Sequence, residues 1–298
     1  MMKKQRRLTE SELVLSNEGK VYHLNLKPGD IGNTVFLFGD PGRVELFSSL
    51  FDSRELTVEN REFVTHTGKY RNKTISAIST GIGTDNIDIV INELDALLNI
   101  DLEQRTIRPN TQKINLIRIG TSGALQDNIN PGAIIATSIA GGLDNLIYYY
   151  QGYETIINHE LGLAFSHHTH WPEINSTPYF IHASNTLLKK IIKVSNHQGI
   201  TLSAPGFYGP QGRSLRINTL DPEYINKVSQ FSYKEMKVNN FEMEASALYG
   251  LSRLMGHEAV TVCLALANRK KNLFLTDYKE KMAKSLQTIL DAITNENR

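Results

Sequence analysis

Short apolar runs and amphipathic stretches alternate along most of this chain. Runs typical of buried strands lie at Thr34–Phe38, Lys73–Thr80, Ile114–Ile119, Ala133–Thr137 and Ala259–Ala267. Apolar side chains recur at helical spacing from Ile87 to Leu98, and helices are also predicted at Val44–Phe51, Pro178–His197, Glu242–Met255 and Tyr278–Thr294. Strands that alternate with helices predict an α/β fold, with a largely parallel or mixed sheet covered on both faces.

The pattern weakens between Gly141 and Trp171, a segment rich in Tyr and His that is predicted to be irregular. No low-complexity linker and no internal repeat interrupts the chain. We therefore expect a single domain over residues 16–298. Residues 1–15 are expected to form a flexible N-terminal tail, because chain ends are commonly poorly ordered.

Composition adds limits on partners and location. Of 298 residues, 40% are hydrophobic, and 32 Lys and Arg side chains nearly balance 31 Asp and Glu side chains, which argues against nucleic acid as a partner. No window is apolar for long enough to span a membrane. The single cysteine, Cys263, has no disulfide partner in the chain, and the basic N-terminus lacks the apolar core of a secretion signal. A cytoplasmic location is therefore expected.

Candidate chemistry lies where three predicted strands run into glycine-containing turns, at Gly39, Gly81 and Gly120. Ligands of open α/β sheets bind at the carboxyl ends of strands, and glycine lets backbone N–H groups approach an anion closely. Arg43 follows the first turn and Arg118 precedes the third, and their forked guanidinium groups match phosphate oxygens in pairs. Each feature alone is common in ordinary turns, but together they favour a phosphate site.

Other chemistries are less well supported. Gly81-Ile82-Gly83-Thr84-Asp85-Asn86 ends in Asn where a dinucleotide fingerprint needs Gly or Ala, and no GxxxxGK[ST] segment exists. No metal site is expected, because the histidines of the middle segment lack Asp or Cys partners and are better explained as loop or surface residues; they are His159, His167, His168 and His170. Cys263 is better explained as a small core residue than as a nucleophile.

An ordered set of motifs resembles the uridine phosphorylase branch of the nucleoside phosphorylase family. The motifs are Phe38-Gly39-Asp40-Pro41-Gly42-Arg43, Arg61-Glu62-Phe63, Ser79-Thr80-Gly81-Ile82-Gly83, Arg118-Ile119-Gly120-Thr121-Ser122-Gly123, Phe241-Glu242-Met243-Glu244 and Ala267-Asn268-Arg269. They span nearly the whole chain from about Val21. The resemblance implies a single-domain α/β fold whose central mixed sheet is partly barrel-like and flanked by helices. It also implies a pentosyltransferase that cleaves uridine reversibly with phosphate to give uracil and ribose 1-phosphate, as in pyrimidine salvage.

The same resemblance assigns the phosphate and ribose sites. Phosphate is expected to be held by Gly39, Arg43, Arg61, Arg118 and Thr121, and ribose by His23, Thr121, Met243 and Glu244. Glu244, Arg118 and Arg43 are the expected catalytic residues, because a carboxylate favours the positive charge that develops on the sugar. Glu242 is explained instead as an acid that complements the dipole of the following helix.

In the family, the equivalents of Arg61 and His23 reach into the active site of a neighbouring subunit. The resemblance therefore implies a homo-oligomer with shared active sites, a dimer at least and a hexamer of three dimers by likeness.

The base site is expected at Gly123, Phe207, Gln211, Arg213 and Arg269. A side-chain amide offers both a donor and an acceptor to the imide edge of uracil, and a guanidinium stabilises negative charge on the leaving base. The purine branch places an Asp where this chain has Asn268, which makes purine specificity less favoured. The sequence does not decide whether deoxyuridine or thymidine is also accepted.

Inorganic phosphate is the expected co-substrate, and no cofactor is expected. Some relatives use a monovalent cation for which Glu62 would be a ligand, but Thr84-Asp85-Asn86 departs from the family pattern beside that place. Three alternatives stay open: a purine nucleoside phosphorylase, a nucleosidase that uses water, and a non-catalytic nucleoside-binding protein.

Overall fold

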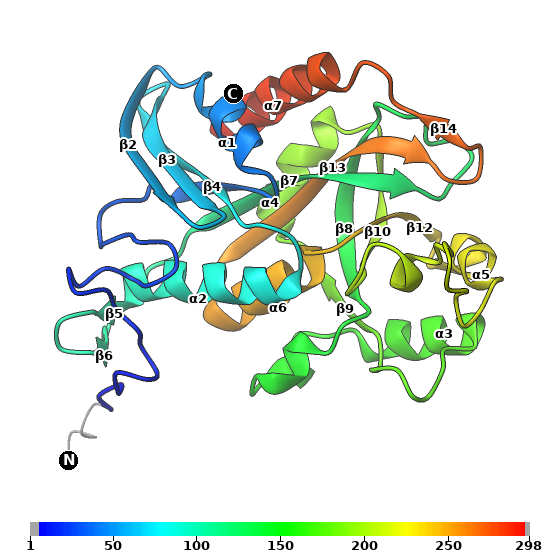
Figure 1. Cartoon of the computed structure of the whole chain (residues 1–298), viewed down its shortest axis with the longest axis horizontal. Coiled ribbons are helices and arrows are strands. Elements are labelled where there is room, and N and C mark those ends of the chain that lie inside the picture. The colour runs from blue at the N-terminus through cyan, green and yellow to red at the C-terminus, as the bar shows by residue number, and fades with distance from the viewer. Residues whose placement is uncertain (1–5, 296–298) are drawn as a thin grey trace.

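The computed structural model describes residues 6–295 and contains alternating strands and helices (Figure 1). The strands are β1 (Thr34–Phe38), β2 (Ser53–Asn60), β3 (Phe63–Tyr70), β4 (Lys73–Ser79), β5 (Ile100–Asp101), β6 (Thr106–Ile107), β7 (Asn115–Ala124), β8 (Ile134–Gly142), β9 (Tyr179–His182), β10 (His197–Ser203), β11 (Ser232–Tyr233), β12 (Met236–Glu242), β13 (Glu258–Asn268) and β14 (Leu273–Phe274). The α-helices are α1 (Pro41–Ser48), α2 (Thr84–Asn99), α3 (His159–Thr169), α4 (Asn185–Ile191), α5 (Tyr224–Gln230), α6 (Ala245–Met255) and α7 (Tyr278–Thr294).

One large mixed sheet organises the described residues. Its order is β11-β12-β10-β8-β13-β7-β1-β4-β3-β2, and β12 also pairs with β7, so that five strands close into a ring. Within this ring, β12 pairs with β10, β10 with β8 and β13 with β7 in parallel. The other two ladders, β13 with β8 and β12 with β7, are antiparallel, and the second joins Phe241 to Gly123. The expected partly barrel-like mixed sheet is therefore confirmed.

Helices cover both sides of this sheet, as predicted. Figure 1 shows α2 and α6 side by side on one side of the sheet and α1 and α7 on the other. The apolar stripe of α2 is buried at Ile87, Val90, Ile91 and Leu94, and each of these side chains is fully shielded from solvent. Burial of such a stripe, at about 25 cal/mol per Å² of apolar surface, supplies the main stabilising contribution.

The first strand and helix illustrate how the sequence sets local structure. Val35 to Phe38 of β1 are all buried, and Phe36 packs on Phe47 of α1 at 4.6 Å between ring centroids. Asp40 caps α1 by accepting the Gly42 N–H at 2.9 Å, and Pro41 occupies the first helical position, where no backbone donor is needed.

Three sequence interpretations are corrected by the structure. The helix predicted over Pro178–His197 is instead β9 followed by the short helix α4, since buried Tyr179, Phe180 and Ile181 pair with β8 and Ser184 caps a new helix. The segment predicted to be irregular contains α3, which Asn158 caps through the Leu161 N–H. The helix predicted from Glu242 begins at Ala245, because Glu242 still belongs to β12.

Gly120 also differs from the expectation of a turn, since β7 continues through it to Ala124. A Cβ atom at Gly120 would lie 2.1 Å from Nη1 of Arg118, so glycine leaves room for that guanidinium to fold back over the strand. Opposite β7, the register of β13 shifts between Ala265 and Ala267, which makes Leu266 a one-residue β-bulge.

The N-terminal segment expected to be a tail is described from Arg6, and residues 1–5 lie outside the described range. Within it, the Leu8 N–H donates to the Arg105 carbonyl at 2.8 Å, and Leu13 is buried against the core. The boundary of the domain at residue 16 stays a prediction.

Candidate active site

Most of the predicted site residues line one cavity of about 320 Å³ at the carboxyl ends of β1, β7 and β12. Its walls contain the predicted residues Gly39, Arg43, Arg118, Thr121, Gly123, Phe207, Gln211, Arg213, Met243 and Glu244. Segments that lie far apart in the sequence thus converge where ligands of α/β sheets bind.

Two guanidinium groups form one end of this cavity, that of Arg43 partly buried and that of Arg118 buried. Arg43 comes from the first turn of α1 and reaches the Ile119 carbonyl at 3.3 Å, while Arg118 is 4% exposed. Among the described residues, the Nε atoms of Arg43 and Arg118 are both buried and have no hydrogen-bond partner, although Arg43 Nε lies 3.7 Å from Asp40 Oδ2 in an ion pair. Burial lowers the pKa of Arg43. Buried donors without partners are costly, so this end of the cavity is built to receive an anion with several acceptor oxygens.

Arg118 is held between two buried carboxylates. It pairs with Glu244 through Nη2, and its Nη1 lies 3.2 Å from Glu242 Oε2. Burial by itself lowers the pKa of Arg118, but Glu244 and Glu242 outweigh burial and raise it. Arg118 therefore stays charged.

The two carboxylates differ in what else they contact. Glu242 accepts the N–H groups of Glu244 and Ala245 at 2.9 and 3.0 Å, so it caps α6 as its helix-dipole interpretation expects. Glu244 accepts the Gly83 N–H at 2.9 Å through Oε1. Both carboxylates line the cavity, but both oxygens of Glu242 accept N–H groups at the start of α6, whereas Glu244 makes no such contact with the helix and can accept from a sugar hydroxyl.

The glycine turns after β1 and β4 meet at the floor of the site. Thr80 donates its N–H to the Phe38 carbonyl at 2.7 Å, and a Cβ atom on Gly39 would lie 3.3 Å from the Gly81 carbonyl. Gly83 has a φ of 101°, which an L side chain rarely adopts. These turns keep the backbone close to the guanidinium groups.

The other end of the cavity carries the predicted base-binding residues. The Arg213 guanidinium lies 3.9 Å over the Phe207 ring, and its Nη1 donates to Gln211 Oε1 at 2.7 Å. Arg269 is not a lining residue, but it donates to the Gln211 carbonyl at 2.6 Å and packs against Gly123. Burial, and then the like charge of Arg213, lower the pKa of Arg269 to about 10. This end therefore favours a planar ligand that carries negative charge.

Asn268 is committed to the fold. Its Nδ2 donates to the carbonyls of Gln126 and Ile129, both at 2.8 Å, and its Oδ1 accepts the Lys271 N–H. The amide is fully buried and has no remaining donor for a purine ring.

His23 and Arg61 lie together outside the cavity lining. Arg61 is exposed and reaches the Tyr22 hydroxyl at 3.3 Å, and Tyr22 packs edge-on against His23 at 5.0 Å between centroids. Glu93 accepts from His23 Nδ1 at 2.7 Å. Glu62, the expected cation ligand of some relatives, accepts from the Asn86 side-chain amide at 3.5 Å.

Several lining residues were not predicted as site residues. Ile82, Ser122, Glu242 and Ala267 stand inside the recognised motifs, and their neighbours gave the signal that could have found them. Phe274 is 71% exposed, pairs with Ala267 in the β13–β14 hairpin and belongs to no motif. It reaches the cavity only because β14 folds back and pairs with β13, a contact that no sequence motif indicates.

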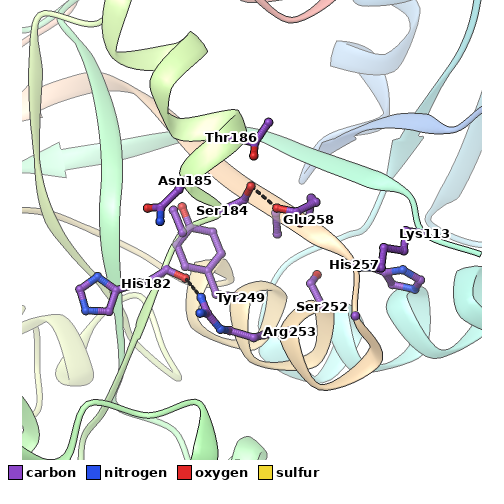
Figure 2. Close-up of a pocket in the computed structure, with 13 residues that line it drawn as sticks. Lys113, His182, Ser184, Asn185, Thr186, Tyr249, Ser252, Arg253, His257 and Glu258 are labelled. Carbon is purple, nitrogen blue, oxygen red and sulfur yellow. Dashed lines mark hydrogen bonds between the residues drawn. The ribbon is translucent and has the colours of Figure 1, made fainter.

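A second cavity, of about 350 Å³, lies near the start of β13 and the end of α6 (Figure 2). Figure 2 shows that Ser184 donates a hydrogen bond to Glu258 there and that Arg253 donates one to the His182 carbonyl. None of the predicted site residues lines this cavity, so it is not the candidate site.

Three further features bear on function. Burial raises the pKa of the Cys263 thiol to about 12, in keeping with a core residue. Over residues 6–295, no three His, Cys, Asp or Glu side chains gather in a way that would hold a metal ion. In the same range, no helix has the length and apolar character needed to cross a membrane.

Comparison with known proteins agrees with this geometry. The chain is 34% identical over 270 residues to a uridine phosphorylase of Thermococcus kodakarensis, which covers 90% of this chain and 84% of that protein. It is 29% identical over 260 residues to the uridine phosphorylase of Escherichia coli, covering 85% of this chain and 88% of that protein. A Trypanosoma brucei nucleoside phosphorylase described as showing uridine phosphorylase activity superposes with a TM-score of 0.86 at 28% identity, over 94% of this chain and 98% of that one. The family model of the phosphorylase superfamily matches residues 33–295, and the chain therefore belongs to that superfamily.

Proposed function

We propose that this protein is a pentosyltransferase that cleaves uridine reversibly with inorganic phosphate to give uracil and ribose 1-phosphate. The observation that carries the proposal is the pair of guanidinium groups of Arg43 and Arg118, each with a buried Nε donor that has no hydrogen-bond partner in the described part of the chain, beside the Glu244 carboxylate in one cavity. The activity named for its relatives supports the same reaction.

In this proposal phosphate binds between Arg43, Arg118, Thr121 and the backbone of Gly39. The anion supplies the acceptor oxygens that Nε of both arginines lacks. It is thereby held beside the anomeric carbon of the sugar, so that the enzyme has already met the entropic cost of bringing the two reactants together.

Ribose lies between phosphate and base in the same cavity. Glu244 accepts hydrogen bonds from the 2′- and 3′-hydroxyls, and Met243 packs against the sugar. As the glycosidic bond lengthens, positive charge develops on the ribose, and the nearby carboxylate stabilises it. The electron pair of the broken bond leaves with the base.

Uracil binds at the end formed by Phe207, Gln211, Arg213 and Arg269. Gln211 and Arg213 read the carbonyls and the ring N–H of the imide edge. The two guanidinium groups stabilise the negative charge that spreads onto the carbonyls, so no strong general acid is required. A purine would need a proton donor near its ring, and the amide of Asn268 is fully used by backbone groups.

We also propose a homo-oligomer in which each active site is completed by a neighbour, with a dimer as the minimum and a hexamer of three dimers as the full assembly. His23 and Arg61 are gathered with Tyr22 at the surface, outside their own cavity lining. In a partner's site His23 would contact the 5′-hydroxyl and Arg61 the phosphate. The products, a free pyrimidine and an activated ribose, fit a cytoplasmic salvage role.

The shared site is tested by mixing two variants whose activity is strongly reduced. Arg61→Ala removes a residue supplied to the neighbour, and Glu244→Gln removes one that stays in its own site. Hybrids formed from both should recover part of the activity, because some sites then receive both intact residues. No recovery, with mixed assembly verified by mass, would contradict the shared site.

The reaction is tested with a panel of nucleosides incubated with and without phosphate, with free base as the readout. Uracil should be released from uridine only when phosphate is present, and inosine should react far more slowly. Equal release in phosphate-free buffer would make the protein a nucleosidase and would refute the proposal.

A further inference from the structure

Asp144 is a buried carboxylate that belongs to none of the recognised motifs. It lies two residues after the end of β8 and is 8% exposed. Its oxygens accept the Leu146 N–H at 2.8 Å, the Tyr179 hydroxyl at 2.9 and 3.0 Å, and the Ser246 hydroxyl at 3.1 Å. The carboxylate thus ties three segments together: the loop after β8, strand β9 and helix α6.

The surrounding chain is shaped to permit this arrangement. A Cβ atom on Gly142 would lie 2.2 Å from Cζ of Tyr179, so glycine at this position lets the tyrosine ring reach Asp144. Tyr179 is also within 3.2 Å of the Ser246 hydroxyl. The three polar side chains form a closed set in which every oxygen has a partner.

No cation pairs with Asp144 among the described residues, although it is buried. Burial raises its pKa, and the three donors oppose that effect. A buried carboxylate without a counterion is costly unless hydrogen bonds stabilise it, and Asp144 accepts them from the Leu146 N–H and from the hydroxyls of Tyr179 and Ser246. The hydrogen bond from Ser246, its partner on α6, therefore contributes more to stability than a hydrogen bond at the surface would.

The link to the active site runs through the first turn of α6. Ser246 stands two residues after Glu244, and its backbone N–H donates to Ser203 Oγ at 2.9 Å. That serine hydroxyl in turn donates to Glu242, which caps the helix. The first turn of α6, which directly follows Glu244, is therefore held through the backbone by Ser203 and Glu242 and through the Ser246 side chain by Asp144.

We propose that Asp144 is a positioning residue for Glu244. It locks the first turn of α6, so that the Glu244 carboxylate stays aligned with the Gly83 N–H and Arg118 and meets the ribose hydroxyls without rearrangement. Asp144 itself does not touch the substrate. This inference rests on the proposed function, because the role of Glu244 at the ribose comes from it.

A double-mutant cycle in kcat/KM tests the inference. Asp144→Asn should lower kcat/KM for uridine by about tenfold or more and should affect 2′-deoxyuridine less, since that substrate lacks one hydroxyl that Glu244 binds. Ser246→Ala, which cuts only the link to α6, should have the same selective effect. Adding Asp144→Asn to Glu244→Gln should cost little further, because both changes act through the same carboxylate.

The matched control is Asp291→Asn, which alters another carboxylate that accepts a tyrosine hydroxyl, Tyr70 at 2.8 Å, far along the chain on α7. It should leave the ratio of the two substrates unchanged. Fully additive losses for Asp144→Asn and Glu244→Gln, or equal losses on both substrates, would show a general structural effect and overturn the inference.

A readout without substrate keeps the two proposals separable. In a crystal structure of Asp144→Asn, or of Ser246→Ala if the first variant does not fold, the Glu244 carboxylate should leave the Gly83 N–H. A carboxylate that stays in place overturns the positioning role. Failure of the wild-type protein to release uracil with phosphate would instead refute the proposed function and leave this structural result standing.

Discussion

Glu244 accepts the backbone N–H of Gly83 at 2.9 Å, although 161 positions separate the two residues along the chain. The contact joins the start of α2 to the start of α6, so the carboxylate proposed to bind ribose is aligned by a turn that only glycine readily adopts. The same carboxylate pairs with Arg118 on β7. The Glu244 side chain therefore connects the residues proposed to bind the sugar with those proposed to bind phosphate.

Removal of Arg43 is expected to weaken phosphate binding selectively. Arg43→Met should raise the KM for phosphate by about tenfold or more, because a charged hydrogen bond contributes about 1.5–3 kcal/mol. The KM for uridine should change much less. Steady-state rates at saturating uridine and varied phosphate provide the measurement.

The control for this change is Arg54→Met, since Arg54 pairs with Glu45 at the surface at 2.7 Å. It should leave both KM values unchanged. Similar increases in both KM values for Arg43→Met would argue against a phosphate ligand.

An added methyl group at Gly120 is expected to displace Arg118. The new Cβ would lie 2.1 Å from Nη1 of Arg118, and the flexible guanidinium would give way before the strand does. Gly120→Ala should therefore keep a near-native circular dichroism spectrum and lose about a hundredfold or more in kcat/KM, in the range seen when one oxyanion donor is lost. Wild-type activity in this variant would mean that Arg118 does not need its place over Gly120.

Replacing Asn268 by Asp is expected to reduce stability without creating purine activity. The new carboxylate would face the carbonyls of Gln126 and Ile129, which now accept from the amide at 2.8 Å. Loss of two buried hydrogen bonds should lower the free energy of unfolding by at least about 2 kcal/mol. Urea unfolding and an inosine assay provide the measurements, and a stable variant that cleaves inosine would contradict the assignment of Asn268 to the fold.

His66 is expected to make the protein less stable in mild acid. Burial, and then the charge of Arg54, lower its pKa below the value of 6.5 of an unfolded chain. The unfolded chain therefore binds the proton first, and the free energy of unfolding falls as pH drops below about 6.5, while no loss occurs above that pH.

The measurement is urea unfolding of the wild type and His66→Gln at pH 7.5 and pH 5.5. His66→Gln should lose less stability between the two pH values. His167→Gln, at an exposed position on α3, should behave like the wild type. Identical pH dependence in all three proteins would rule out His66 as the cause.

The sequence predicts the elements whose apolar pattern is strong. Strand β1 and helix α7 begin and end where the pattern places them, because their buried faces are continuous. The β2–β3 hairpin escaped prediction because Ser53–Asn60 is largely polar and solvent-facing. Its pairing with β3 supplies the order that its own sequence does not indicate.

The features of the site that the sequence pattern does not predict depend on long-range contacts. The resemblance names Arg118 and Glu244 separately, but their ion pair joins residues 126 positions apart and depends on how the sheet closes. Asp144 belongs to no motif, and its side-chain partners come from β9 and α6, which no local pattern brings together. Periodicity describes which face is buried and carries no information on which elements meet.

The bulge at Leu266 resets which side of the sheet each later residue of β13 faces. An uninterrupted strand alternates its side chains, so one extra residue inverts the phase of Ala267, Asn268 and Arg269 relative to everything before them. Whether Ala267 and Arg269 face the proposed base site consequently depends on the number of residues in β13 as well as on their type. Deleting Leu266 would exchange the two faces of the strand for every residue that follows it.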